Sequence, residues 1–222
     1  MPATANAPAP AADTDLAAQR QTMIDSQLKT VGVIDAAVVA AMGSVPREAF
    51  VPPALHGLAY ADAALEVAPG RFLLEPMALA LLVQNARIDP GARVLVVGAA
   101  TGYSAAVLAA MGMRVTALES DTTLAAAARA AGIDVVEGPL PAGWPAAAPY
   151  DLVLFEGAIE TLPAAIAAQL SPGGRAAAIV RIDGVGHAHA GPVVGDRIAG
   201  RAFLEIAAKP LPGFRRAAAF AF

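Results

Sequence analysis

The chain has 222 residues and a formal net charge of −4, and it contains no cysteine. This length suits one domain with a substantial core, and the missing cysteines exclude disulfides and thiol catalysis. A mildly acidic chain lacks the basic face that a phosphate backbone requires, so we expect no nucleic-acid partner. Hydrophobic residues make up 57% of the sequence, but much of this is alanine. No run with Leu, Ile, Val and Phe character reaches the roughly 20 residues of a membrane span, so we expect no membrane partner.

The first residues, 1–13, are rich in Ala, Pro and Thr. They contain no basic n-region and no apolar h-region, so they do not read as a secretory signal. We expect a disordered tail there and, by default, a cytoplasmic protein. Residues 14–222 are then expected to form a single domain.

Residues 14–90 have the pattern of a mostly helical lead-in. Apolar residues recur at roughly helical spacing over Thr14–Thr30. Asp35 is placed to cap a second helix over Ala36–Met42, and Leu79–Ala86 has the pattern of the last helix.

From residue 91 onward, short β-branched segments alternate with alanine-rich helical segments. This order predicts a doubly wound parallel sheet, and the most apolar strand is expected to be central. Segments near Arg201–Ala208 and Ala217–Phe222 predict an antiparallel end to the sheet. The predicted strands are Arg93–Val97, Arg114–Leu118, Ile133–Val136, Tyr150–Phe155 (the central one) and Arg175–Val180, and the predicted helices are Ala105–Met111, Thr122–Ala131 and Leu162–Leu170.

The most informative segment is a turn of small residues after the first of these strands. It reads Gly98-Ala99-Ala100-Thr101-Gly102-Tyr103 and leads directly into a helix. Such a turn lets a ligand approach the backbone closely, and the helix N-terminus offers free N–H groups. Ligands of open α/β sheets bind at the carboxyl ends of the strands, so we expect a nucleotide-like ligand here.

The residue types in the turn narrow the choice of nucleotide. A dinucleotide fingerprint would need glycine at Ala100 and Tyr103, and a P-loop would need a lysine that this turn lacks. Glu119 ends the next strand, where its carboxylate could accept hydrogen bonds from both hydroxyls of a ribose. The S-adenosylmethionine (SAM) binding form of the fold uses this arrangement. The alternative is a tight strand-to-helix turn beside a solvated glutamate.

Motifs in both halves of the chain occur together in one family. Those of the lead-in are Met23-Ile24-Asp25-Ser26-Gln27-Leu28, Ala41-Met42-Gly43-Ser44-Val45-Pro46-Arg47-Glu48-Ala49-Phe50-Val51-Pro52 and Leu58-Ala59-Tyr60-Ala61-Asp62; those of the core are Gly98–Val107, Gly143-Trp144-Pro145, Tyr150-Asp151 and Leu170-Ser171-Pro172-Gly173-Gly174-Arg175. With them the chain resembles the protein-L-isoaspartate O-methyltransferase family. The resemblance implies a doubly wound, mostly parallel seven-stranded sheet of the SAM-dependent methyltransferase type with an N-terminal helical lead-in.

The same resemblance implies a reaction and a set of site residues. SAM would donate a methyl group, without a metal, to the carboxylate of an isoaspartyl residue in a damaged protein or peptide. That acceptor has a pKa of roughly 4 and is already ionised at neutral pH, so alignment of the reactants matters more than a general base. The implied cofactor-binding residues are Gly98, Ala99, Ala100, Thr101, Gly102, Tyr103, Glu119, Ser120, Gly138, Leu140 and Glu156, and the implied substrate-side residues are Phe72, Leu73, Leu74 and Glu75.

Several of these positions depart from the family pattern. Leu74 stands where the family has its active-site serine, so no catalytic residue is assigned, and Glu75 beside it would repel an anionic substrate. Ala100 replaces a glycine, and Pro139 replaces an aspartate that would bind the adenine amino group. Each lost hydrogen bond costs on the order of 1 kcal/mol, so several losses would weaken SAM binding by roughly one to two decades.

Two alternatives to isoaspartyl methylation therefore stay open. The chain could be a divergent member without that activity, acting as a module that binds SAM, its product S-adenosylhomocysteine (SAH) or a protein. It could also methylate another acceptor. His187 and His189 lie in glycine-rich surroundings, and an exposed flexible loop is the preferred interpretation over a metal site.

Overall fold

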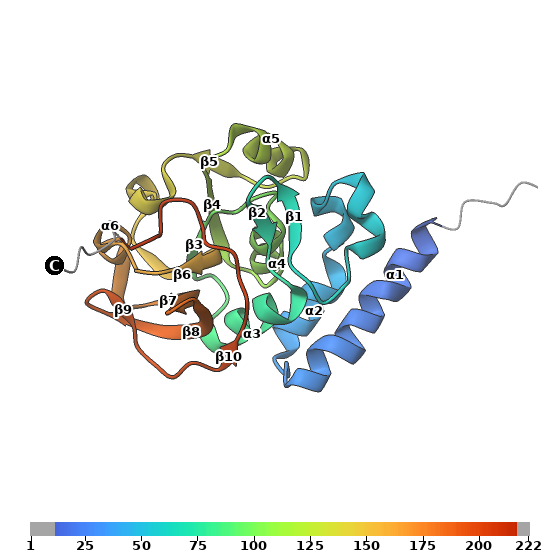
Figure 1. Ribbon diagram of the computed structural model, residues 1–222, viewed down its shortest axis with the longest axis horizontal. Coiled ribbons are helices and arrows are strands. Elements are labelled where there is room, and N and C mark those ends of the chain that lie inside the picture. The colour runs from blue at the N-terminus through green and yellow to red at the C-terminus, as the bar shows by residue number, and fades with distance from the viewer. Residues whose placement is uncertain (1–11, 217–222) are drawn as a thin grey trace, which may run out of the picture.

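The computed structural model describes residues 12–216, and a twisted, mostly parallel sheet forms its centre (Figure 1). Its strands lie in the order β10-β8-β7-β6-β3-β4-β5, and β9 pairs with β8. The pairs from β7 to β5 are parallel, whereas β8 pairs antiparallel with β7, β9 and β10. The strands are β3 (Arg93–Val97), β4 (Arg114–Glu119), β5 (Val135–Glu137), β6 (Tyr150–Ile159), β7 (Leu170–Ile182), β8 (Val185–Val194), β9 (Arg197–Ile198) and β10 (Leu204–Glu205). The α/β fold and the central place of the Tyr150 strand are confirmed. Within residues 12–216 the sheet has eight strands instead of the expected seven, because β9 adds to β8.

Alternating side chains on the central strands build a core on each face of the sheet. Val94 and Val96 of β3 belong to one apolar cluster, and Leu95 and Val97 belong to the other. Successive strand residues point to opposite faces, so a strand with both sides apolar is buried on both. The helices are α3 (Pro76–Ala86), α4 (Tyr103–Ala110), α5 (Thr122–Ala130) and α6 (Ala164–Ala167), the last shorter than predicted.

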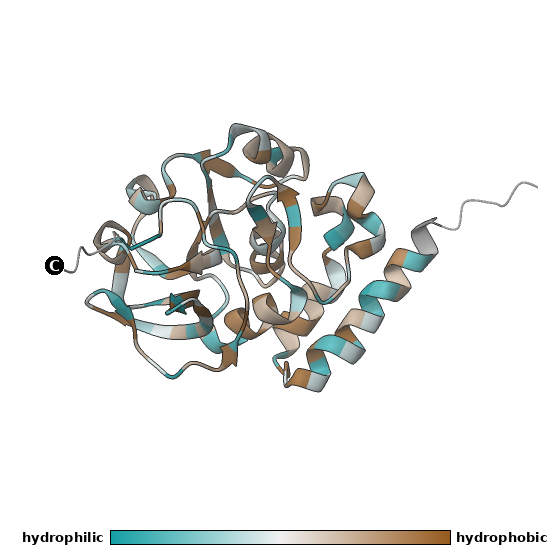
Figure 2. Cartoon of the chain, viewed as in Figure 1, coloured by the Kyte–Doolittle hydropathy of each residue, from teal (hydrophilic) through white to brown (hydrophobic). Residues whose placement is uncertain are grey.

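The lead-in packs on the same core as the sheet. Its first helix shows mixed polar and apolar colours in Figure 2. Leu16 packs partly buried against the core, and Met23 at the end of the helix is fully buried. Asp35 caps the second helix as predicted, because its Oδ1 accepts from Ala37 N at 2.8 Å and from Val38 N at 3.2 Å. The lead-in elements are α1 (Ala12–Met23), a π-helical turn η1 (Ile24–Leu28), α2 (Ala36–Ser44) and the 3₁₀ turns η2 (Lys29–Val31), η3 (Arg47–Phe50) and η4 (Pro53–Leu58).

A short antiparallel hairpin interrupts the helical lead-in. It consists of β1 (Leu65–Ala68) and β2 (Arg71–Leu73), and the turn between them places Gly70 at φ 71°. This hairpin was not predicted from the sequence, because strands this short show too little alternation of polar and apolar residues. The hairpin matters for function because it brings Arg71 to the carboxyl edge of the sheet.

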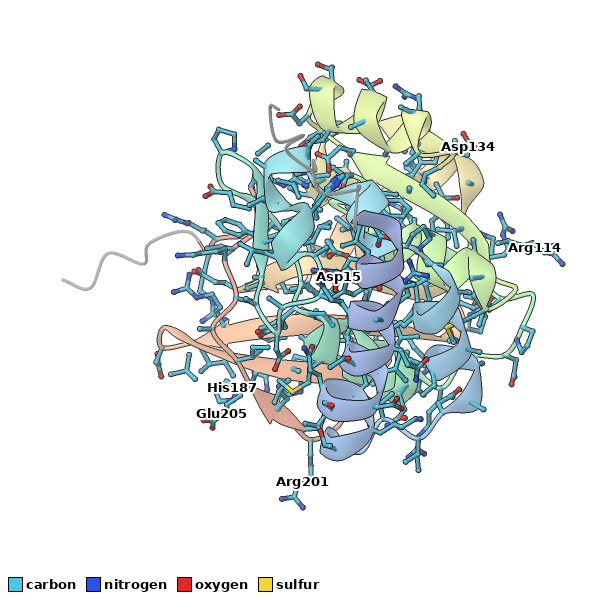
Figure 3. The ribbon with its side chains drawn as sticks, turned by 90° about the vertical axis from the view of Figure 1, so that its right-hand side faces the viewer. Asp15, Arg114, Asp134, His187, Arg201 and Glu205 are labelled. Carbon is cyan, nitrogen blue, oxygen red and sulfur yellow. The ribbon has the colours of Figure 1, made fainter. Side chains whose placement is uncertain are left out.

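The segment around the two histidines is a strand, so the prediction of an exposed flexible loop is wrong. His187 and His189 lie in β8, half-buried between β7 and β10. The flanking glycines allow close backbone approach instead: a Cβ on Gly186 would lie 2.2 Å from Ile206 O. In Figure 3 His187 lies beside Glu205 of β10, and its Nδ1 is 3.9 Å from the carboxylate.

At the C-terminus, the predicted strand over 201–208 is reduced to β10, and the predicted strand over 217–222 lies outside the described residues. Of the predicted tail, residues 1–13, the first eleven lie outside them as well, whereas Ala12 and Asp13 belong to α1. Within residues 12–216, no helix is long and apolar enough to cross a membrane.

Candidate functional site

The glycine turn lies at the carboxyl end of β3, as the sequence predicts. Its backbone is left-handed at Gly98 (φ 73°), Ala100 (φ 51°) and Gly102 (φ 96°). Gly98 N and Ala99 N both donate to Leu118 O of the neighbouring strand, at 2.9 and 3.0 Å. Ala100 therefore holds a conformation that favours glycine, in a place where the family resemblance implies one.

Glu119 lies beside this turn, at the end of β4, and its side chain is fully buried. Its carboxylate accepts backbone hydrogen bonds from Ala100 N at 2.8 Å, Ser120 N at 2.7 Å and Asp121 N at 2.9 Å. The alternative of a solvated glutamate at a strand end is thus excluded. A buried carboxylate also needs a counter-charge.

Arg71 supplies that charge from the β1–β2 hairpin. Its Nη1 and Nη2 donate to the two carboxylate oxygens of Glu119 at 2.5 and 2.6 Å, and its side chain is 6% exposed. This fork-to-carboxylate geometry is among the strongest that side chains make. Sequence reasoning missed Arg71, because nothing along the chain indicates that residues 71 and 119 meet.

A segment near the C-terminus covers the turn from the other side. A Cβ on Gly98 would lie 2.7 Å from Leu211 Cδ2 and 3.3 Å from Arg71 Nη2, and a Cβ on Gly157 would lie 2.9 Å from Leu211 Cγ. Backbone hydrogen bonds fix this segment to β6: Ala158 N donates to Lys209 O at 2.9 Å, and Leu211 N donates to Ala158 O at 2.8 Å. Leu211 was not predicted to belong to the site either.

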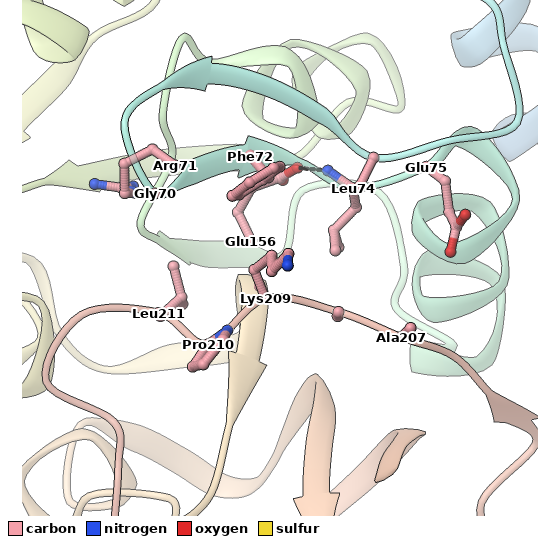
Figure 4. Close-up of a pocket in the computed structure, with 13 residues that line it drawn as sticks. Gly70, Arg71, Phe72, Leu74, Glu75, Glu156, Ala207, Lys209, Pro210 and Leu211 are labelled. Atoms are coloured by element: carbon pink, nitrogen blue, oxygen red, sulfur yellow. Dashed lines mark hydrogen bonds between the residues drawn. The ribbon is translucent and has the colours of Figure 1, made fainter. Parts of the chain in front are cut away.

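Between the hairpin and this segment lies a small cavity of about 10 Å³ (Figure 4). That is room for about one water molecule. An open groove of about 500 Å³ adjoins it, between Gly70 and Phe72 of the hairpin and residues 209–213 and 215. The small cavity is the part beside Glu156. The predicted substrate-side residues Phe72, Leu74 and Glu75 line it, together with Glu156 and Arg71. In this conformation the chain's own side chains fill the place expected for a nucleoside, so the residues present do not fit SAM without movement of Arg71 and Leu211.

Glu156 belongs to a buried polar cluster on the floor of the cavity. Its Oε1 accepts from Leu74 N at 2.9 Å, and its Oε2 accepts from the Ser104 hydroxyl. Burial raises the pKa of Glu156, opposed by these hydrogen bonds and by the charges of Arg47 and Arg71. Both carboxylate oxygens of Glu156 are therefore already hydrogen-bonded within the protein.

Arg47 is the other charged member of the cluster and is fully buried. It donates to Ala59 O at 2.9 Å and to Leu74 O at 2.7 Å, and its guanidinium carbon lies 4.6 Å from the centre of the Tyr103 ring. Desolvation lowers the pKa of Arg47, opposed by Tyr103 and Glu156. This arginine, which lies in one of the lead-in motifs, thus fixes the backbone of Leu74, which lines the cavity.

Other residues predicted to bind the cofactor point elsewhere. Thr101 Oγ1 donates to Phe50 O of the lead-in at 2.5 Å, and the Tyr103 ring packs edge-on against Phe50 at 5.7 Å. Their side chains thus face the lead-in. Leu73 and Leu74 are buried in the core, so the family's serine position is packed with apolar atoms.

The predicted residues after β4 and β5 are not gathered at the cavity either. Ser120 is exposed, whereas Leu140 is buried in the apolar cluster that also packs against Trp144. A Cβ on Gly138 would lie 3.4 Å from Trp144 Cζ3, so the indole covers that glycine. Among residues 12–216, no group of three or more His, Asp or Glu side chains is placed to hold a metal ion.

Comparison with known proteins gives the family. The family model "Protein-L-isoaspartate(D-aspartate) O-methyltransferase (PCMT)" matches residues 18–185. The chain belongs to the protein-L-isoaspartate(D-aspartate) O-methyltransferase family. A protein-L-isoaspartate O-methyltransferase of Methylorubrum extorquens (strain PA1) is 46% identical over 167 residues, which are 72% of this chain and 73% of that protein. One of Rhodopseudomonas palustris (strain HaA2) is 39% identical over 73% of this chain and 69% of that protein.

Solved structures of the same family share the fold. A protein-L-isoaspartate O-methyltransferase superposes with a TM-score of 0.64 at 24% identity, over 82% of this chain and 66% of that one. A putative family member from Plasmodium falciparum, in complex with SAH, gives a TM-score of 0.64 at 16% identity, over 82% of this chain and 92% of that one. The predicted Rossmann-like methyltransferase fold with its N-terminal helical lead-in is confirmed.

Proposed function

We propose that this member of the isoaspartyl methyltransferase family transfers a methyl group from SAM to a carboxylate of a protein or peptide. The observation that carries the proposal is the buried Glu119 beside the turn Gly98–Gly102, at the carboxyl end of the sheet. A carboxylate in this place is suited to accept from two ribose hydroxyls, and the turn leaves backbone N–H groups close to the ligand. Occupation of this site requires that Arg71 and Leu211 withdraw.

We propose an isoaspartyl residue of a damaged protein as the acceptor, and hence a role in protein repair in the cytoplasm. The names of the relatives support this acceptor. The acceptor carboxylate is ionised at neutral pH, so the site needs to hold and orient it rather than to deprotonate it. Leu74 supplies no hydroxyl for that purpose, and Glu75 adds negative charge to the cavity wall.

A second candidate function rests on those same residues. Because Leu74 is buried and apolar and the cleft is filled, a SAM- or SAH-binding module without isoaspartyl activity, or an enzyme with another acceptor, also fits. Cofactor contacts stay predictions for the glycine turn, Ser120, Gly138 and Leu140. The boundary near residue 90 between the lead-in and the SAM-binding sheet also stays a prediction.

A methyl-transfer assay separates these functions. The chain is incubated with methyl-labelled SAM and an isoaspartyl peptide, and the matched aspartyl peptide is the control. We expect label on the isoaspartyl peptide alone. Label on neither peptide, together with measurable SAH binding, would favour the second candidate. In that case Leu74→Ser tests whether the missing hydroxyl is the cause, since it restores the family's residue at that position.

A further inference from the structure

We propose that Arg71 and Leu211 form an internal plug that keeps the nucleoside site closed, so that SAM or SAH binds only by displacing the Arg71–Glu119 ion pair. The proposal rests on the proposed function, because it takes the turn at Gly98 and Glu119 as the ligand site. It assigns to Arg71 the place that a ribose would otherwise take.

The hydrogen bonding of Glu119 supports this assignment. Arg71 offers two parallel donors, one to each carboxylate oxygen, at 2.5 and 2.6 Å. Neighbouring ribose hydroxyls offer two donors as well, and the two sets of donors compete for the same oxygens. The three backbone N–H groups of Ala100, Ser120 and Asp121 would remain in place when Arg71 leaves.

Leu211 closes the second side of the site. It packs against Gly98, which follows β3, and Gly157, which lies in the last part of β6. A Cβ on Gly98 or Gly157 would lie 2.7 or 2.9 Å from a Leu211 carbon, so Leu211 occupies the space beside both glycines. A ligand can approach the backbone of these glycines only after the Leu211 side chain has moved away. The side chain is 4% exposed, and the apolar cluster holds it in position.

The two halves of the plug come from segments that are fixed by different backbone hydrogen bonds. Arg71 is carried by a two-stranded hairpin whose turn, at Gly70, is exposed. Leu211 lies in a segment that makes two backbone hydrogen bonds with Ala158 of β6, one through Lys209 O and one through Leu211 N. A two-stranded hairpin has few backbone hydrogen bonds to lose, so we assign the larger opening movement to β1–β2. The C-terminal segment then needs to shift only far enough for the Leu211 side chain to withdraw.

Calorimetric titration with SAH tests the plug. The proteins compared are the unchanged chain, Arg71→Gln, Leu211→Ala and two matched controls. Arg114→Gln removes an exposed arginine from the start of β4, and Leu162→Ala removes a buried leucine of the same apolar cluster. The apparent affinity for SAH is proportional to the fraction of protein in the open state. Arg71→Gln should raise that fraction, so we expect it to bind SAH at least about tenfold more tightly than the unchanged chain. Leu211→Ala should gain less, and the controls should match the unchanged chain.

Hydrogen exchange without ligand gives a second readout. Arg71→Gln should increase exchange in residues 65–74 and leave β3 and β4 protected, whereas Arg114→Gln should change neither. If Arg71→Gln fails to fold, Arg71→Lys retains the charge but not the paired donors, and a smaller gain in both measurements is expected.

The outcomes separate the plug from the proposed function. Equal SAH affinity of the unchanged chain and Arg71→Gln would overturn the plug and leave the function standing. SAH binding by none of the variants, even with faster exchange in the hairpin, would overturn the proposed function and the assignment of Arg71 to the ribose place with it.

Discussion

Buried charged side chains dominate the site at the scale of single residues. Arg71 and Glu119 neutralise each other, and Glu156 lies between Ser104, Leu74 and the nearby arginines. Buried charges are tolerated only when they are paired and hydrogen-bonded, and they mark functional sites more often than surface charges do. None of these partnerships was predictable from spacing along the chain. Arg71 and Glu119 are 48 residues apart.

The raised pKa of Glu156 makes stability depend on pH in a defined direction. The folded chain binds this proton more tightly than the unfolded chain, so the unfolding free energy falls as pH rises above the ordinary carboxyl value of 4.5. Relative to Glu156→Gln, which cannot titrate, the unchanged chain should lose stability progressively as pH rises from the ordinary carboxyl value towards the raised pKa of Glu156. Urea unfolding of both proteins between pH 4.5 and 8 measures the difference. A pH-independent difference between the unchanged chain and Glu156→Gln would show that burial does not perturb this carboxyl group.

At the scale of elements, local sequence signals located most helices and strands, and their ends were less well predicted. The Asp35 cap and the strand Arg93–Val97 are as expected, whereas the helix α3 begins at Pro76, before the predicted Leu79. The hairpin β1–β2 was not predicted at all. Its strands are stabilised by contacts with the sheet edge and not by a pattern of their own.

The end of α3 provides a test of local backbone strain. Arg87 caps this helix at φ 51° and ψ 62°, and it is exposed. A left-handed conformation costs an L-residue about 1 kcal/mol, whereas glycine adopts it freely. Arg87→Gly should therefore raise the unfolding free energy by about 1 kcal/mol, measured by urea denaturation.

The matched control is Arg114→Gly, at an exposed strand position without a positive φ. This change should lower the unfolding free energy by about 0.5–1 kcal/mol, because glycine there only adds freedom to the unfolded chain. Destabilisation by both changes would refute the strain at Arg87.

At the scale of the whole molecule, the two ends of the described chain are parts of its core. Met23 and Leu28 of the lead-in share an apolar cluster with Val96 of the central sheet. Near the other end, Phe214 is 1% exposed and packs edge-on against Phe155 at 5.4 Å. The C-terminal segment that carries Leu211 is therefore a structural part of the domain.

Removal of the Phe214 ring tests this integration. Phe214→Ala should lower the unfolding free energy by about 3–5 kcal/mol, as expected for a buried aromatic side chain replaced by alanine. Phe203→Ala, at a half-buried position of the same C-terminal region, should cost clearly less. Thermal and urea unfolding measure both. Equal, small effects would mean that the segment is only loosely attached to the sheet.

The sequence by itself determined the α/β class, the glycine turn at Gly98, the carboxylate at the end of the next strand and the family, because hydrophobic period, turn residues and motifs are local properties of a chain. Only the tertiary structure decided what faces that turn. The Arg71–Glu119 pair, the cover by Leu211 and the strand that holds His187 all depend on contacts between distant segments. Such contacts follow from how sheet edges and loops pack together, and no periodicity along the chain encodes them.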